Sequence, residues 1–200
     1  STEDTGSRNT AIGNRALNSL NYDGNGYNVA IGHEAGVTVS TGLLNILIGG
    51  FAGDALTTGG DNVAIGYAAL GAEDGHGKNI AIGTQALEDQ NAGADGYNIA
   101  IGHQAGKDVT DGVNNVLIGG LAGDAITSGN QNVFIGRDSG GANTIGNSNI
   151  AIGKDALATN VAADRNVAIG HGSLSQMTAA STTDTYNTAV GYLAGTVISS

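Results

Sequence analysis

Asn62-Val63-Ala64-Ile65-Gly66 is one copy of a five-residue motif, Asn-x-(Ala/Leu/Phe)-(Ile/Val)-Gly, that recurs along the chain. Eleven copies begin at Asn9, Asn28, Asn45, Asn62, Asn79, Asn98, Asn115, Asn132, Asn149, Asn166 and Asn187. Their separations are 19, 17, 17, 17, 19, 17, 17, 17, 17 and 21 residues. A short and nearly fixed period is typical of a solenoid, in which one supersecondary unit is stacked on copies of itself.

Each motif predicts a short β-strand. Positions are counted from the Asn, which is position zero; positions one and three hold Val, Ile or Thr, and position two holds Ala, Leu or Phe. A short β-branched run closed by Gly is typical of a strand whose side chains alternate between two faces. Both faces are apolar, which favours parallel strands covered on both sides. We therefore expect an all-β parallel solenoid of eleven coils of 17–21 residues, with positions one and three in the coil core and position two against a neighbouring subunit.

The Gly at position four closes every strand. A Gly required in each coil indicates a backbone with positive φ or the close approach of another backbone. We predict a corner at Gly32, Gly49, Gly66, Gly83, Gly102, Gly119, Gly136, Gly153 and Gly170, and at the equivalent Gly13 and Gly191 of the end repeats.

The Asn at position zero predicts a ladder of side-chain amides. In stacked parallel coils about 4.8 Å apart, each carboxamide can donate to the carboxamide or the backbone of the next coil. We expect this structural role for Asn28, Asn45, Asn62, Asn79, Asn98, Asn115, Asn132, Asn149 and Asn166.

Positions eight and eleven compensate for each other in size. Gly36 at position eight is followed by Val39 at position eleven, whereas Leu70 is followed by Glu73. Because protein interiors are close-packed, this tendency indicates that one interior space is filled from either of two backbone positions.

The repeats indicate a single domain that grew by duplication. Residues 1–8 precede the first repeat, and residues 9–200 form one solenoid. Residues 9–78 and 79–148 align without a gap as two four-repeat blocks, and residues 149–200 follow. We expect the segment to come from a longer fibre, because neither end shows the polar cap that solenoids need.

Composition restricts the class of protein. With 35 Gly, 2 Phe and no Trp, Pro or Cys, the chain can build only a thin core and no disulfides. A net charge of -11 with 7 basic residues argues against nucleic-acid binding. No apolar run approaches the ~20 residues of a membrane span, so we expect no membrane insertion. Covering the second apolar face with symmetry mates would add buried area, and we expect a parallel homotrimer.

The repeats also resemble those of known fibrous proteins. The stretches 62–66 and 149–157, Asn-Val-Ala-Ile-Gly and Asn-Ile-Ala-Ile-Gly-Lys-Asp-Ala-Leu, resemble the head repeats of trimeric autotransporter adhesins. Adhesin heads have shorter coils, and the 17-residue spacing is more similar to the repeats of phage-type tail fibre proteins that end in a self-cleaving endosialidase-type chaperone. The resemblance covers residues 9–200 and implies a left-handed parallel β-roll, three chains wide, that serves as an adhesive shaft.

The resemblance implies an extracellular, non-enzymatic protein at a cell surface or in a virion tail fibre. We expect a glycan or protein receptor, and we expect contacts where the period relaxes, at 22–27, 91–97 and 175–186. Exposed Tyr side chains suit such contacts, and the candidates are Tyr22, Tyr27, Tyr97 and Tyr186. Packing over a wider coil is the alternative for Tyr27 and Tyr97.

Other chemistry is less well supported by the sequence. We expect no catalytic residues, no cofactor and no metal site. His33, His103 and His171 recur at position five but lie about four coils apart, too far to share an ion. Alternative functions are Ca²⁺ binding at Asp23-Gly24-Asn25-Gly26 and at Ala94-Asp95-Gly96, or ice binding. A column near position twelve suggests the latter, at Ser40, Thr57, Thr110, Thr127 and Thr144.

Overall fold

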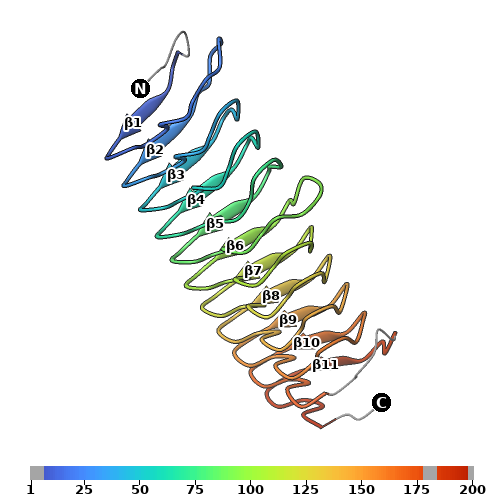
Figure 1. Cartoon of the computed structure of the whole chain (residues 1–200). Helices are drawn as coiled ribbons and strands as arrows, with labels where there is room; N and C mark the ends of the chain where they lie inside the picture. Colours follow the sequence, from blue (N-terminus) through green and yellow to red (C-terminus); the bar gives the residue numbers. More distant parts are fainter. Residues whose placement is uncertain (1–6, 178–183, 198–200) are drawn as a thin grey trace.

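The chain is a parallel β-solenoid of about ten turns. The computed structural model describes residues 7–177 and 184–197. One eleven-stranded sheet runs along the rod with its strands in sequence order (Figure 1). The strands are β1 (Thr10–Ile12), β2 (Val29–Ile31), β3 (Ile46–Ile48), β4 (Val63–Ile65), β5 (Ile80–Ile82), β6 (Ile99–Ile101), β7 (Val116–Ile118), β8 (Val133–Ile135), β9 (Ile150–Ile152), β10 (Val167–Ile169) and β11 (Thr188–Val190).

Equivalent positions of successive coils lie directly opposite each other. All ten neighbouring pairs of strands are parallel, and each pairs position one with one, two with two and three with three. The longer coils keep this register because their extra residues lie in the loops between strands. In the described part of the chain every regular element is a strand, so none of it forms a helix that could cross a membrane.

The two faces of the sheet are reversed relative to our expectation from the sequence. In β2 to β11 the residue at position two is buried, whereas positions one and three are half-buried or exposed. Position two therefore belongs to the coil interior, and positions one and three face outward. In β2 to β10 every outward residue is Val or Ile, and we call these side chains the outer stripe.

The interior is narrow, which explains why position two must face inward. Where position two is large, position eight of the same coil is Gly: Leu47 packs over Gly53 and Phe134 over Gly140. Where position two is Ala, position eight is often a buried Leu, as at Leu70. A coil of this width has no room for two large side chains on opposite walls, because interiors are packed to near-crystalline density.

Position eleven also points inward, whatever its chemistry, in the ten coils where that residue is described. Aliphatic residues such as Val39 and Leu56 are fully buried there, and so are the polar residues Glu73, Gln90 and Asn143. Positions eight and eleven, whose side chains compensate for each other in size, therefore both face the interior. A Leu at position eight does not release position eleven to solvent, so these polar side chains must find partners inside the protein.

Candidate functional site

A continuous ladder of Asn side chains runs through the interior. Each side-chain oxygen accepts a hydrogen bond from the backbone N–H of the next Asn, at 2.9–3.1 Å, from Asn9 to Asn187. The direction is the reverse of the one we expected, because the side chain accepts from the next coil. Its amide donates to the carbonyl at position fourteen, as Asn115 Nδ2 does to Gly129 at 2.9 Å.

The ladder has one weak point among the described repeats, at Asn79. Its Nδ2 is buried and has no hydrogen-bond partner. Asn79 begins a 19-residue coil, and its amide lacks the bond to the carbonyl at position fourteen that is made in the 17-residue coils. A lengthened loop therefore leaves one interior amide unsatisfied, at a cost of about 1–3 kcal/mol.

The Gly residues at position four form a tight corner. Their φ angles lie between 127° and 144°. A Cβ built on Gly119 would lie 2.7 Å from the carbonyl carbon and oxygen of Gly136, the corner of the next coil. Both a positive φ and the close approach of another backbone therefore require Gly here.

The Tyr residues of the lengthened coils lie beside basic side chains of the preceding coil. The Arg8 guanidinium lies 5.4 Å from the ring centre of Tyr27 and donates to its hydroxyl. Lys78 lies 5.1 Å from the ring centre of Tyr97 and donates to its hydroxyl at 3.1 Å. Such cation–π contacts contribute about 0.5–1 kcal/mol at exposed sites and fix the orientation of the ring.

The third lengthened coil repeats this arrangement. The Arg165 guanidinium lies 5.8 Å from the ring centre of Tyr186, whose hydroxyl donates to Asp184 at 2.8 Å. Tyr27, Tyr97 and Tyr186 are exposed by 46–66%, whereas Tyr22 is half-buried. Part of the expected contact loop 175–186 lies outside the described residues, at 178–183.

A second face of the rod carries aromatic and acidic side chains that the sequence analysis did not single out. Phe51 contacts His33 and Tyr67 edge to face, with ring centres 5.2 and 5.7 Å apart. A hollow of about 430 Å³ lies beside this row, lined also by Asp54 and Glu88. Burial, and then the charges of Glu34 and Glu88, raise the pKa of Asp54.

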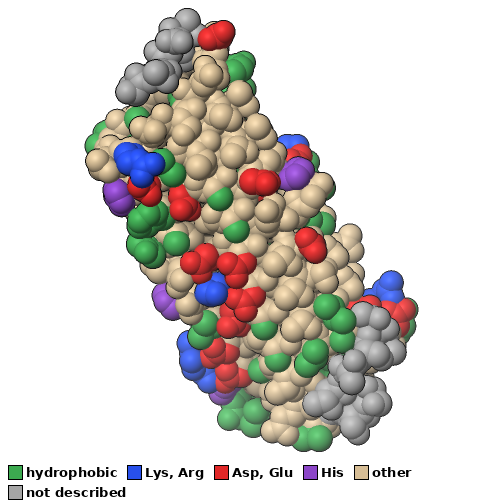
Figure 2. Space-filling model, in the orientation of Figure 1, with side chains coloured by type: hydrophobic (Ala, Val, Ile, Leu, Met, Phe, Trp, Pro, Cys, Tyr) green, Lys and Arg blue, Asp and Glu red, His purple; other side chains and the backbone are tan. Residues whose placement is uncertain are grey.

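The same acidic face continues along the rod. Figure 2 shows Asp and Glu side chains gathered midway along the molecule, with Lys and Arg side chains among them. Lys107 lies 3.1–3.9 Å from Glu88, Asp89 and Asp108. The charged residues of this face recur at positions six, nine and ten of the coils. This pattern is visible in the sequence when the repeats are aligned with one another.

The histidines at position five do not form a shared site. His33, His103 and His171 are exposed and lie in separate coils. The Asp95 carboxylate, in the second candidate Ca²⁺ loop, is paired with Lys78, and this pairing lowers the pKa of Asp95. Its negative charge is therefore already balanced, and the loop is a poor Ca²⁺ ligand set.

The hydroxyl column at position twelve connects the coils. The Thr127 hydroxyl donates to the Thr144 carbonyl at 3.1 Å, and Thr144 donates in turn to Val161 at 3.2 Å. Ser40, Thr57 and Thr110 make equivalent bonds to the next coil. Because these donors are used within the protein, the geometry gives no support to an ice-binding surface.

One cluster of metal-ligating side chains lies in the loop between β4 and β5. Glu73 is fully buried, Asp74 is exposed and His76 is half-buried, and one ligand atom of each lies within 4.8 Å of the others. In the sequence, Glu73 stands out only as the residue that accompanies Leu70. The unusual pair of an acid at position eleven and His at position fourteen was the available signal.

The fold and these surfaces define the chain as a parallel β-solenoid repeat protein. Comparison with protein-family models, with curated proteins and with solved structures found no match.

Proposed function

We propose that the chain is a non-enzymatic structural segment of an adhesive fibre, in which three parallel copies associate along the outer stripe. The outer stripe carries the proposal: it is a continuous row of Val and Ile on the open face of the sheet, from Val29 to Ile169. Large exposed apolar surfaces of soluble proteins usually mark interaction sites. A regularly repeating apolar surface is matched better by the same surface of another copy, aligned coil by coil, than by a partner of irregular shape.

The proposed role as a shaft is supported by the internal organisation of the rod. Each coil contacts mainly its neighbours, so length can grow by duplication without a new core. The interior polar groups of the Asn ladder are used in coil-to-coil hydrogen bonds. The repeated geometry of the motif therefore serves cohesion of the coils, which leaves recognition, in this proposal, to side chains outside the motif.

Attachment is proposed to use the exposed Tyr side chains of the lengthened coils. Tyr27, Tyr97 and Tyr186 present aromatic faces to solvent, and basic neighbours hold each ring in place. Pre-oriented aromatic rings lose little entropy on binding and are suited to sugars or to protein surfaces. The proposed setting is extracellular, at a cell surface or in a virion tail fibre, with a glycan or protein receptor.

The assembly is tested by sedimentation equilibrium of the intact chain. The proposal predicts three copies per particle. Ile80→Lys or Val116→Lys, which place a charge in the outer stripe, should weaken association at least tenfold. Ser128→Lys, at an exposed position away from the stripe, is the matched control and should leave it unchanged. A stable, folded monomer of the unmodified chain would contradict the proposal.

Attachment is tested separately, on variants that still assemble. Binding to glycan arrays and to whole cells should fall when Tyr27 and Tyr97 are replaced by Ala. Replacement of Thr58, which is exposed elsewhere on the rod, is the control. Equal binding by the Tyr variants would reject these side chains as the contact and leave the structural role intact.

A further inference from the structure

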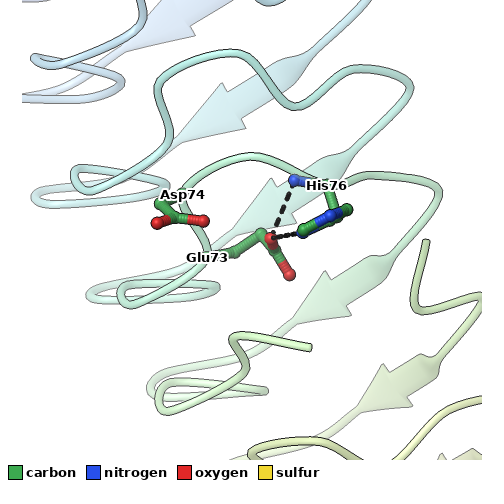
Figure 3. A group of neighbouring side chains, drawn as sticks. All are labelled: Glu73, Asp74 and His76. Atoms are coloured by element: carbon green, nitrogen blue, oxygen red, sulfur yellow. Dashed lines mark hydrogen bonds and ion pairs between the residues drawn. The ribbon is translucent and has the colours of Figure 1, made fainter. Parts of the chain in front are cut away.

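The loop that connects β4 to β5 places three ligating side chains together at the rim of the solenoid. Figure 3 shows the Glu73 side chain directed toward His76, with Asp74 on the adjoining turn. Glu73 occupies position eleven and is fully buried, while Asp74 is exposed. The cluster thus extends from the interior to the solvent, which gives a ligand a path of entry.

Two of these side chains have buried polar atoms that the protein does not satisfy. Glu73 Oε1 accepts a hydrogen bond from the His76 backbone N–H at 3.0 Å, but Oε2 has no partner. His76 Nδ1 is also buried without a hydrogen-bond partner and lies 3.7 Å from Glu73 Oε1. Buried polar atoms are nearly always paired, so two unpaired ones on neighbouring side chains point to a site for an ion or water.

Two other coils with a polar residue at position eleven satisfy it within the protein. Gln90 occupies the equivalent position in the next coil; its oxygen accepts from Asn98 at 2.6 Å and its amide donates to the Thr110 carbonyl at 3.3 Å. Asn160 bonds twice to the backbone of Ala163. Asn143 also lacks partners, but it has no ligating side chain at position fourteen, where Gly146 stands.

The sequence of this coil changes both positions at once. In the other 17-residue coils position fourteen is Gly or Ala, whereas here it is His76. The acid at position eleven and the imidazole at position fourteen therefore occur together in one coil. Neither residue is needed to build the solenoid, since the neighbouring coils fold around other residues.

We propose that Glu73, Asp74 and His76 bind one divalent transition-metal ion, with Zn²⁺ as the best match. One imidazole nitrogen and two carboxylate oxygens are typical Zn²⁺ ligands, with water completing a tetrahedron. Ca²⁺ and Mg²⁺ prefer more ligands, all of them oxygen. The ion would neutralise the buried Glu73 carboxylate and brace the loop between β4 and β5.

The geometry requires only a modest adjustment. Ligands about 2.1 Å from a tetrahedral Zn²⁺ lie about 3.4 Å apart. Glu73 Oε1 and His76 Nδ1 are 3.7 Å apart. One ligand atom from each of the three residues lies within 4.8 Å of the other two. Asp74 is exposed, so its side chain can rotate to close the remaining gap without moving the core.

The test is calorimetric titration of the intact, untagged chain with ZnCl₂ in a non-coordinating buffer. The expected result is one Zn²⁺ per chain and a higher thermal midpoint with the ion, neither of them reproduced by CaCl₂. Glu73→Gln, His76→Asn and Asp74→Asn should each weaken binding at least tenfold. Glu73→Gln should fold normally because Gln90 occupies the same position in the next coil.

Surface histidines are controlled with His33→Asn, which removes an exposed imidazole two coils away and should leave the titration unchanged. Absence of Zn²⁺ binding by the unmodified chain would overturn the proposal. Binding retained by both Glu73→Gln and His76→Asn would overturn it too. If Glu73→Gln misfolds by circular dichroism, the exposed Asp74→Asn decides the question in its place.

Discussion

The Asn ladder makes a quantitative prediction, because two of its members differ in whether the side-chain amide donates hydrogen bonds. Asn115 and Asn79 are both fully buried and both accept the backbone N–H of the next Asn, at 3.0 and 3.1 Å. Asn115 Nδ2 also donates to the Gly129 carbonyl at 2.9 Å and to Asn98 Oδ1 at 3.2 Å, whereas Asn79 Nδ2 has no partner. Replacement of each by Ala removes the same side-chain atoms, so the cavity terms largely cancel.

The difference between the two variants reflects mainly the side-chain donor. Asn98 Oδ1 and Asn132 Nδ2, which also contact the Asn115 side chain, keep other partners in the backbone. Asn115→Ala leaves a backbone N–H and a carbonyl without partners, at about 1–3 kcal/mol each, or about 2–6 kcal/mol together. Asn79→Ala leaves one N–H and also removes an amide that was already unsatisfied, so its loss should be about 1–3 kcal/mol or less. Asn115→Ala should therefore be the less stable variant by at least about 1 kcal/mol.

Urea denaturation followed by far-ultraviolet circular dichroism measures this difference. With a slope of about 1–3 kcal/mol per M, the two midpoints should differ by at least roughly 0.3–1 M. The comparison is valid if the slopes agree, since the two variants then expose similar surface. Equal midpoints, or a greater loss for Asn79→Ala, would refute the assignment of the side-chain donor to cohesion of the coils.

Three further predictions follow from the same structure, the first of them with a control substitution. Gly119→Ala should cost about 3 kcal/mol or more in thermal denaturation, because its φ is 133° and its Cβ would meet Gly136 at 2.7 Å. The adjacent Gly120→Ala, whose nearest contact is at 3.9 Å, should stay within about 0.5 kcal/mol. Phe134→Ala should cost about 3–5 kcal/mol, since the ring is fully buried and no neighbour can refill the space over a Gly; a loss under about 1 kcal/mol would place the ring outside the core. Burial raises the pKa of Glu73, so the folded state holds its proton more tightly than the unfolded state, and stability falls as pH rises through the raised pKa. With a chelator present, Glu73→Gln should therefore stabilise the chain more at about pH 7 than at about pH 4; no pH dependence in the comparison would contradict a buried carboxyl.

The architecture was predictable because the repeat specifies it in several independent ways. The 17-residue period gives the stacking, and the β-branched residues closed by Gly give the strand and its corner. Asn occupies the same place in every repeat, which predicts that the strands pair in parallel and in register. Each of these signals concerns the backbone, and the backbone is what the repeated motif determines most strongly.

The facing of the strands was predicted wrongly, for a physical reason. A three-residue strand with apolar residues on both faces has no polar side to show which face meets water. The signal that distinguishes them is size. Leu47, Phe134 and Leu117 at position two are each followed by Gly at position eight, a pairing that makes sense only if both point into one narrow interior.

The candidate metal cluster was missed because an acid in a turn region is normally solvated. Only the structure shows that position eleven points inward even when it carries a charge, as at Glu73. The contacts of Phe51 with His33 and Tyr67 likewise depend on side chains from three coils. Such features arise from the stacking, and they are invisible until the register and the facing are both known.

The outer stripe as a subunit interface is the central claim, and a single cysteine tests it most directly. The chain has no Cys, so Val133→Cys introduces a unique thiol in the middle of the stripe. Its rate of reaction with a maleimide should be low at concentrations where the chain associates and should rise on dilution. Ser128→Cys, which is exposed on another face, should react rapidly throughout. Equal, concentration-independent rates at the two sites would contradict the claim that the stripe is covered by other copies of the chain.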